Sequence, residues 1–174
     1  MPERLERLTQ SLLDAARRAG AGAADAIAVQ GRSQSIDIRA GRLEQAERAE
    51  GVEIGLRVLI GGRQACVSVS DISARTIVDV AERAVAMARE APEDPYAGLA
   101  DASDLARSIV DLDLFDPTEV SSDRLREAAL AMEAAALGVD GVSNSAGAGA
   151  SAGMGGMVLV TSHGFSGSYM ASRF

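Results

Sequence analysis

Hydrophobic residues at the start of the chain recur at the spacing of a helix. Between residues 4 and 19, leucine and alanine return at every third or fourth position, and glutamate and arginine fill the opposite side. This period places the apolar residues on one face, so we predict an amphipathic helix over residues 4–19. Gly20 and Gly22 follow and are expected to end it.

Over residues 24–70 the period changes to two, which predicts strands. Asp25, Ile27 and Val29 share a face in the first strand, and Ile36 and Ile38 share a face in the second. Two turn candidates separate these strands, Gly31-Arg32 and Ala40-Gly41.

The clearest alternation lies between residues 52 and 70. Five apolar residues project from one side of a strand: Val52, Ile54, Leu56, Val58 and Ile60. Gly61-Gly62 then permits a tight hairpin. The return strand carries Ala65, Val67 and Val69 on one face and Gln64, Cys66, Ser68 and Ser70 on the other. This hairpin predicts an antiparallel sheet with one apolar face and one polar face.

A helix over residues 74–90 is expected to cover the apolar face. Asp71 or Ser73 can cap its start, and prolines at 92 and 95 require it to end before them. Its apolar stripe consists of Ile77, Ala81, Ala84, Val85 and Ala88. Residues 92–118 have no sustained period and are rich in proline and aspartate, which predicts a surface loop with one short turn near residues 103–107.

A third helix is predicted over residues 122–137, followed by strands over residues 140–174. The apolar side of this helix is expected to carry Leu125, Ala129, Met132 and Ala136, and Gly138 stands at its C-terminal end. The last strands include residues 157–161 and 169–173, with a turn near His163-Gly164.

These elements predict an α+β fold in which about three helices pack on a mostly antiparallel sheet. The chain is 174 residues long and ends within a predicted strand, which would leave an unpaired sheet edge. We therefore expect residues 1–174 to be one N-terminal α+β domain of a longer protein.

Composition excludes several classes of function. The net charge is -8 at pH 7 and the basic residues are not clustered, which argues against a surface for nucleic acid. No apolar run approaches the roughly 20 residues that span a bilayer, and the charged N-terminus does not resemble a secretory signal. A single cysteine cannot form an internal disulfide, so we expect a cytoplasmic protein without membrane or nucleic-acid contacts.

The supply of metal ligands is the strongest constraint. The chain has one histidine, His163, and one cysteine, Cys66, so neither a two-histidine zinc helix nor a multi-cysteine site can be assembled from it. We expect no catalytic, cofactor-binding or metal-binding residue in this chain.

Three other features are better explained by structure than by chemistry. The glycine-rich residues 147–153 precede a β-forming stretch instead of a helix, so they predict a strand connection and no nucleotide loop. Ser162 and His163 are adjacent and would point to opposite faces of a strand, which favours a turn or interface histidine over a catalytic base. Cys66 is expected to be a small packed residue. A long antiparallel sheet with a polar face could also accept an extended peptide as an added strand, and the alternative is that its edges are covered by the rest of the protein or by a partner.

An acidic run at residues 111, 113 and 116 could attract a hard cation. It lacks the glycine and the final glutamate of a calcium loop. A solvated surface loop is therefore the favoured interpretation.

Several stretches resemble the N-terminal region of the TldD/PmbA family. They are residues 93–101 (EDPYAGLAD), residues 111–121 (DLDLFDPTEVS), residues 142–145 (VSNS) and residues 162–164 (SHG). The resemblance covers essentially the whole chain and is closer to the PmbA branch, also called TldE and often labelled a modulator of DNA gyrase.

The resemblance implies a subunit of a cytosolic, zinc-dependent peptidase system. In that family the TldD-type partner carries a HExxxH helix and a further cysteine ligand beyond the N-terminal region, and the PmbA-type subunit generally lacks that motif. No position here matches HExxxH. We therefore expect a non-catalytic region, inactive alone, that shapes a substrate channel and an oligomer. Its expected partners are a TldD-type subunit or another copy of itself, and a peptide substrate.

Two alternatives remain open. The first is a binding module that acts on gyrase or an antitoxin without proteolysis, as the family label suggests. The second is an unrelated enzyme that holds a small molecule in its glycine-rich loop.

Overall fold

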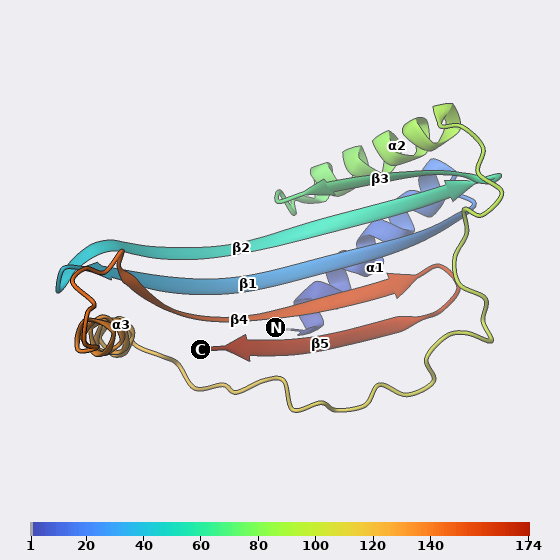
Figure 1. Ribbon diagram of the computed structural model, residues 1–174. Coiled ribbons are helices and arrows are strands. Elements are labelled where there is room, and N and C mark those ends of the chain that lie inside the picture. Colours follow the sequence, from blue (N-terminus) through green and yellow to red (C-terminus); the bar gives the residue numbers. More distant parts are fainter. Residues whose placement is uncertain (1) are drawn as a thin grey trace. The chain divides into compact units, whose positions relative to one another are not determined.

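The computed structural model describes residues 2–174, and within them three helices and five strands (Figure 1). The helices are α1 (Pro2–Ala19), α2 (Ala74–Glu90) and α3 (Ser122–Leu137). The strands are β1 (Ala23–Arg39), β2 (Arg42–Ile60), β3 (Arg63–Val69), β4 (Ala148–Thr161) and β5 (Ser166–Arg173). They form one antiparallel sheet in the order β3-β2-β1-β4-β5, which confirms the predicted α+β class.

The β2–β3 hairpin has the predicted register and turn. Ile60 pairs with Arg63, and the pairing continues to Ile54 opposite Val69. Gly61 and Gly62 take φ values of 56° and 76°, a region that residues with a Cβ seldom adopt. The two glycines therefore allow the tight connection that the sequence indicated.

One predicted turn is wrong. β1 runs without a break from Ala23 to Arg39, so Gly31-Arg32 lies inside a strand instead of between two strands. The chain first reverses at Ala40 and Gly41, where φ is 50° and 71°. Because β1 is flanked by β2 and β4, backbone pairing on both sides supports extended geometry through Gly31.

β2 is also longer than the alternation indicated. It begins at Arg42, and its residues up to 51 are exposed on both faces. Without a buried face this half of the strand has no alternating pattern to detect. Its place in the sheet is set by pairing with β1.

The chain divides into two compact units. Unit 1 comprises residues 1–30, 51–112 and 156–169, and unit 2 comprises residues 31–50, 113–155 and 170–174.

The core of unit 1 is formed by α1 and α2 against the apolar face of the sheet. α2 packs on α1 and on β3, and all five residues of its predicted stripe are buried. The sheet contributes small and branched side chains to this core: Ala24, Ala26, Ala28, Ile54, Leu56, Val58, Val158 and Val160. The predicted cover is therefore confirmed, and α1 shares in it.

Ser73 is the residue that caps α2. Its Oγ accepts a hydrogen bond from the backbone N–H of Thr76, at 3.2 Å. Asp71 supports the cap, because its carboxylate accepts hydrogen bonds from the Ser73 N–H at 2.9 Å and from the Thr76 hydroxyl. These hydrogen bonds lower the pKa of Asp71, the one from Thr76 most strongly.

The core of unit 2 is small and is covered by α3. It contains Ile36, Ile38, Leu125, Ala129 and Ala152. The third helix has its predicted bounds, and its buried stripe continues to a charged residue, Glu133.

The predicted apolar side of α3 is wrong in its second half, because Met132 and Ala136 are exposed and Glu133 is buried. Glu133 Oε1 accepts a hydrogen bond from the N–H of Ala40 at 2.9 Å, and Oε2 accepts one from Gly41 at 2.8 Å. The carboxylate thus binds both amides of the β1–β2 turn. This pairing explains how a charged residue can be buried there.

The last two strands occupy a narrower range than predicted. Residues 138–147 form a loop, β4 starts at Ala148, and a turn over residues 162–164 connects it to β5. The glycine-rich residues are largely part of β4 itself. The predicted loop is confirmed, since residues 91–121 contain neither helix nor strand, and Asp104 N–H donates to the carbonyl of Asp101 in a short turn.

Candidate functional site

Cys66 lies on the polar face of β3 and is exposed, so the prediction of a packed cysteine is wrong. It alternates with half-buried neighbours, and its partner across the hairpin is Arg57 of β2. Because the helices of unit 1 cover the opposite face of this hairpin, the thiol is left facing solvent.

Arg57 forms an ion pair with Asp25 on the same face. Its Nε donates to Asp25 Oδ2 at 2.8 Å, and its Nη2 donates to the same oxygen. The hydrogen bond to Asp25 raises the pKa of Arg57. Both side chains are only partly exposed, so this pair fixes β1 against β2 and does not present a free charge.

Ser162 and His163 lie in the exposed turn between β4 and β5, as predicted for His163. Ser162 is held by the sheet, because its Oγ accepts from Ala24 N–H at 3.0 Å and its N–H donates to Ala24 O at 2.8 Å. The serine therefore closes the end of the β1–β4 ladder.

Cys66 and His163 are too far apart to bind one metal ion. Cys66 is on β3, and His163 follows β4, three strand positions away in the sheet order. At about 4.8 Å per strand the two elements are separated by roughly 14 Å. Within residues 2–174 no group of three His, Cys, Asp or Glu side chains is placed to hold a metal ion.

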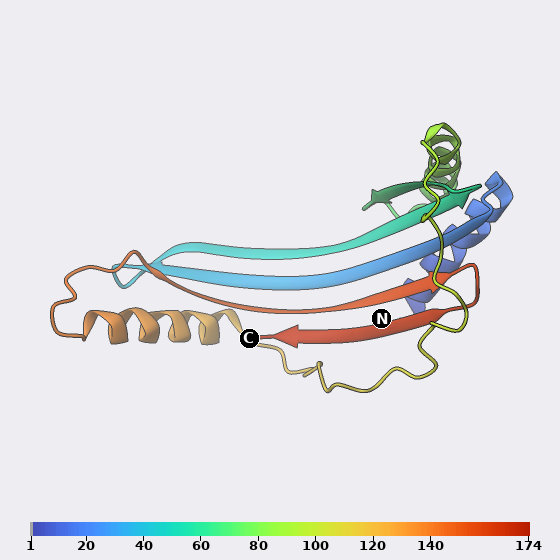
Figure 2. The same cartoon turned by 45° about the vertical axis from the view of Figure 1, so that its right-hand side comes forward.

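The three aspartates of the acidic run are exposed, and the part of the loop that carries Asp116 lies alongside β5. The Asp116 carboxylate accepts a hydrogen bond from Thr118 N–H at 2.8 Å, and hydrogen bonding to Thr118 lowers the pKa of Asp116. Asp116 N–H donates to Ser172 Oγ at 2.8 Å, and Ser172 N–H donates to Leu114 O at 2.9 Å. The loop thus runs beside the edge strand β5 (Figure 2).

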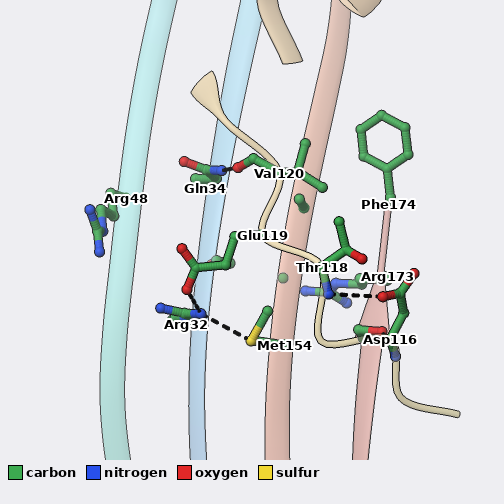
Figure 3. A pocket seen from close by; sticks show the side chains of 14 residues that line it. Arg32, Gln34, Arg48, Asp116, Thr118, Glu119, Val120, Met154, Arg173 and Phe174 are labelled. Atoms are coloured by element: carbon green, nitrogen blue, oxygen red, sulfur yellow. Dashed lines mark hydrogen bonds and ion pairs between the residues drawn. The ribbon is translucent and has the colours of Figure 1, made fainter. Parts of the chain in front are cut away.

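A pocket of about 300 Å³ opens where this loop meets the sheet of unit 2. Figure 3 shows side chains reaching it from β1, β2, β4, β5 and the loop. Three arginines line it, Arg32, Arg48 and Arg173, together with two acids, Asp116 and Glu119. Its charged groups come from β1, β2, β5 and the loop.

The middle of the pocket is charge-neutral. Arg32 Nη2 donates to Glu119 Oε1, and it also lies 3.2 Å from Met154 Sδ. Next to it Gln34 Nε2 donates to the carbonyl of Val120. These contacts hold the loop against β1. The Arg32 guanidinium is therefore already paired with an acid of this chain.

Arg48 and Arg173 differ from Arg32. Both are exposed, and neither forms an ion pair with an acid among residues 2–174. Arg48 projects from β2 and Arg173 from β5, on either side of the pocket (Figure 3). The pocket therefore has two cationic groups available to a ligand.

Gly153 makes room on the pocket's β4 side. A Cβ at this position would lie 3.2 Å from Arg32 O, 3.4 Å from Ser33 Cβ and 3.5 Å from Arg173 Nε. A side chain would therefore crowd the backbone of the neighbouring strand β1 at Arg32. This close approach gives a physical reason for glycine in this part of β4.

Among the pocket residues, Asp116 was considered from the sequence as a possible cation ligand and Ala152 and Gly153 as part of the glycine-rich run, and a structural role was favoured for all three. None of the pocket arginines was singled out for chemistry. One signal was present: Arg32 and Gln34 share the parity of Ile36 and Ile38, which would have placed them on one face of a continuous strand. The predicted turn at Gly31-Arg32 concealed it.

Two family models match the chain. Residues 24–88 match the PmbA/TldA metallopeptidase domain 1, and residues 115–174 match the PmbA/TldA metallopeptidase central domain. Together the two matches span most of the sequence, in the order that the family requires. The chain belongs to the PmbA/TldD family.

A relative of this family member is the metalloprotease PmbA homolog of Haemophilus influenzae. It is 32% identical over 174 residues, which is 99% of this chain and 38% of the relative. The chain thus spans well under half of that protein's length.

Two solved structures share the fold. One from Bacteroides thetaiotaomicron, described as a candidate modulator of DNA gyrase, has a TM-score of 0.87 at 23% identity and is matched over 96% of this chain and 38% of its own. TldE from Thermococcus kodakarensis has a TM-score of 0.77 at 16% identity, over 94% of this chain and 36% of its own. The resemblance to an N-terminal PmbA/TldE-like region is thereby confirmed.

No helix within residues 2–174 combines the length and the apolar character needed to cross a membrane.

Proposed function

We propose that this chain is a non-catalytic region of a PmbA/TldE-type metallopeptidase subunit, which positions peptide and contributes to assembly with a TldD-type partner. The observation that carries the proposal is the placement of its metal-ligand side chains. The single cysteine and the single histidine lie on elements three strands apart, and within residues 2–174 no acidic cluster joins either of them.

Zinc, the metal that the family implies, does not fit the residues present. A catalytic zinc needs three protein ligands within about 2.0–2.3 Å of one point. Neither Cys66 nor His163 has two further ligands nearby within residues 2–174. Hydrolysis in the parent protein or its partner must therefore use side chains from elsewhere.

What this chain offers instead is a surface for binding. Unit 1 is a helix-covered sheet whose other face carries an ion pair and an exposed thiol, and unit 2 holds a pocket with two available arginines. A peptide can be held by such features without being cleaved by them. We propose that this peptide binding takes place in the cytoplasm.

The test compares the full-length parent protein with the 174-residue chain. Each is incubated with a fluorogenic peptide library and zinc, with and without a TldD-type partner, and size-exclusion chromatography follows complex formation. We expect cleavage only in mixtures that contain a HExxxH subunit. Zinc-dependent cleavage by the 174-residue chain alone would overturn the assignment as non-catalytic.

The competing function is a non-proteolytic binder of gyrase. Its support is the description of the Bacteroides structure, which shares the fold at 23% identity. A pull-down with the full-length protein separates the two functions. Stoichiometric gyrase without any peptidase partner would favour the binder, and recovery of a HExxxH-containing partner would favour the peptidase subunit.

A further inference from the structure

The geometry points to the pocket of unit 2 as a binding site for acidic peptide segments, with Arg48 and Arg173 as the residues that contact the ligand's carboxylates. This inference deepens the proposed function, because it names the chemical class of the peptide. It concerns binding and does not depend on cleavage.

The first support is charge. The chain as a whole carries a net charge of -8, so the charge of the pocket has to be counted residue by residue. Three arginines and two acids line the pocket, and Arg32 is already paired with Glu119. The Asp116 carboxylate accepts a hydrogen bond from the N–H of Thr118. Counting side chains alone, two arginines against one hydrogen-bonded acid leave a local excess of positive charge.

The second support is the type of cation. A guanidinium presents a planar fork of N–H donors that matches the two oxygens of a carboxylate. Arg48 and Arg173 stand on β2 and β5, which are three strand spacings or roughly 14 Å apart. Both side chains are long, so the two guanidinium groups can reach two carboxylates on one short extended peptide.

The third support is the apolar surface between the arginines. Val120, Ala152 and Met154 line the pocket, and so does Phe174, which is exposed. This surface suits an apolar side chain between two acidic ones. The volume of about 300 Å³ lies at the lower end of the range for pockets that hold small ligands.

Binding is measured by fluorescence anisotropy on the 174-residue chain at low ionic strength. Labelled pentapeptides with blocked ends contain Glu-Leu-Glu, its neutral counterpart Gln-Leu-Gln, or Lys-Leu-Lys. A fourth peptide contains Gln-Leu-Gln with a free C-terminal carboxylate. We expect tighter binding of a carboxylate peptide than of the neutral and basic ones, and weaker binding as salt rises. The fourth peptide shows whether side-chain or terminal carboxylates are preferred.

Three variants assign the binding to the pocket. Arg48→Gln and Arg173→Gln are each expected to weaken binding of the acidic peptide by about threefold to tenfold, as for exposed charge-assisted hydrogen bonds. Arg126→Gln removes an arginine from the same unit outside the pocket and is expected to leave binding unchanged. Circular dichroism confirms that each variant is folded.

Because Phe174 lines the pocket, the assay is repeated on a chain extended by Gly-Ser-Gly, which moves the terminal carboxylate away.

Equal binding of Glu-Leu-Glu and Gln-Leu-Gln would overturn the inference. Equal losses of binding in Arg48→Gln, Arg173→Gln and Arg126→Gln would also overturn the inference, because binding would then depend on the net charge of the chain and not on the pocket. If peptidase activity is absent in every mixture but the pocket variants still lose binding, the proposed function fails and this inference stands.

Discussion

Unit 1 and unit 2 share the same three long strands but are stabilised very differently. In unit 1 two helices bury a cluster that draws on β1, β2 and β4. In unit 2 one helix buries a few residues, and its buried stripe ends in Glu133, whose carboxylate binds a turn. The pocket with the available arginines lies in unit 2.

The difference indicates that the two units have different roles: unit 1 supplies stability, and unit 2 supplies open surface for a ligand. Burial of apolar surface is the main source of stability, so unit 1 is expected to hold most of the folding free energy. Sites that must admit a ligand need open surface, and this is compatible with the smaller core of unit 2. Four substitutions test this division, beginning with the largest expected effect.

Leu56→Ala should destabilise the protein most. Leu56 is 2% exposed in the core of unit 1, and truncating such a leucine leaves a cavity. We expect the free energy of unfolding to fall by about 3–5 kcal/mol, measured by urea denaturation. Leu43→Ala on the same strand is the control, since Leu43 is 53% exposed and should cost roughly 0.5 kcal/mol or less. Equal losses in the two variants would contradict the core described for unit 1.

Leu125→Ala should have a smaller and more local effect. Leu125 is fully buried in unit 2, where few apolar neighbours surround it. We expect a loss of about 2–3 kcal/mol. Hydrogen exchange should show reduced protection in α3 and around Ile38, with α1 and α2 unchanged.

The control for Leu125 is Leu137→Ala, on the same helix but 40% exposed. Loss of protection in α1 and α2 as well would mean that the two units unfold together, and the comparison between them would lose its energetic meaning.

The sequence predicted the elements that bury one face. Residues 74–90 and 122–137 are helices with the predicted bounds, because an apolar stripe of period 3.6 is visible without knowledge of the partner. The hairpin at 52–70 was equally clear, since Leu56 and its neighbours alternate and Gly61-Gly62 marks the turn.

Unit 2 was harder to predict because its strands are exposed. Residues 42–51 have no buried face, and the glycine-rich start of β4 buries little beyond Ala152, so pairing with β1 is what makes them strands. The pocket is a product of that pairing: Arg48, Arg173 and Arg32 are distant in sequence and meet through the strand order. Glu133 was missed for the same reason, because its partners are the amides of a turn far along the chain.

Glu133→Gln tests whether unit 2 relies on a polar anchor. In the glutamine one oxygen still accepts from a turn amide, but the NH₂ group faces the other N–H. We expect a loss of about 1–3 kcal/mol, because a buried donor is left without an acceptor. Glu127→Gln, exposed on the same helix, is the matched control and should change stability little. Equal stabilities of the two variants would show that apolar contacts alone hold α3.

Asp71→Asn should have the smallest effect, and its dependence on pH tests the cap of α2 in unit 1. Hydrogen bonds from Thr76 and Ser73 lower the pKa of Asp71 below its usual 3.8 in the folded state. A depressed carboxyl pKa contributes stability that is present above the unfolded pKa and is lost as pH falls through the folded pKa. Asp71→Asn should therefore be slightly less stable than the parent at neutral pH, and the gap should close as the pH drops below about 4. Thermal melts of both proteins across this range measure the gap. Because the side chain is exposed, the effect should stay well below that of Leu56→Ala. A difference in stability that persists unchanged at low pH would show that the aspartate acts through its shape instead of its charge.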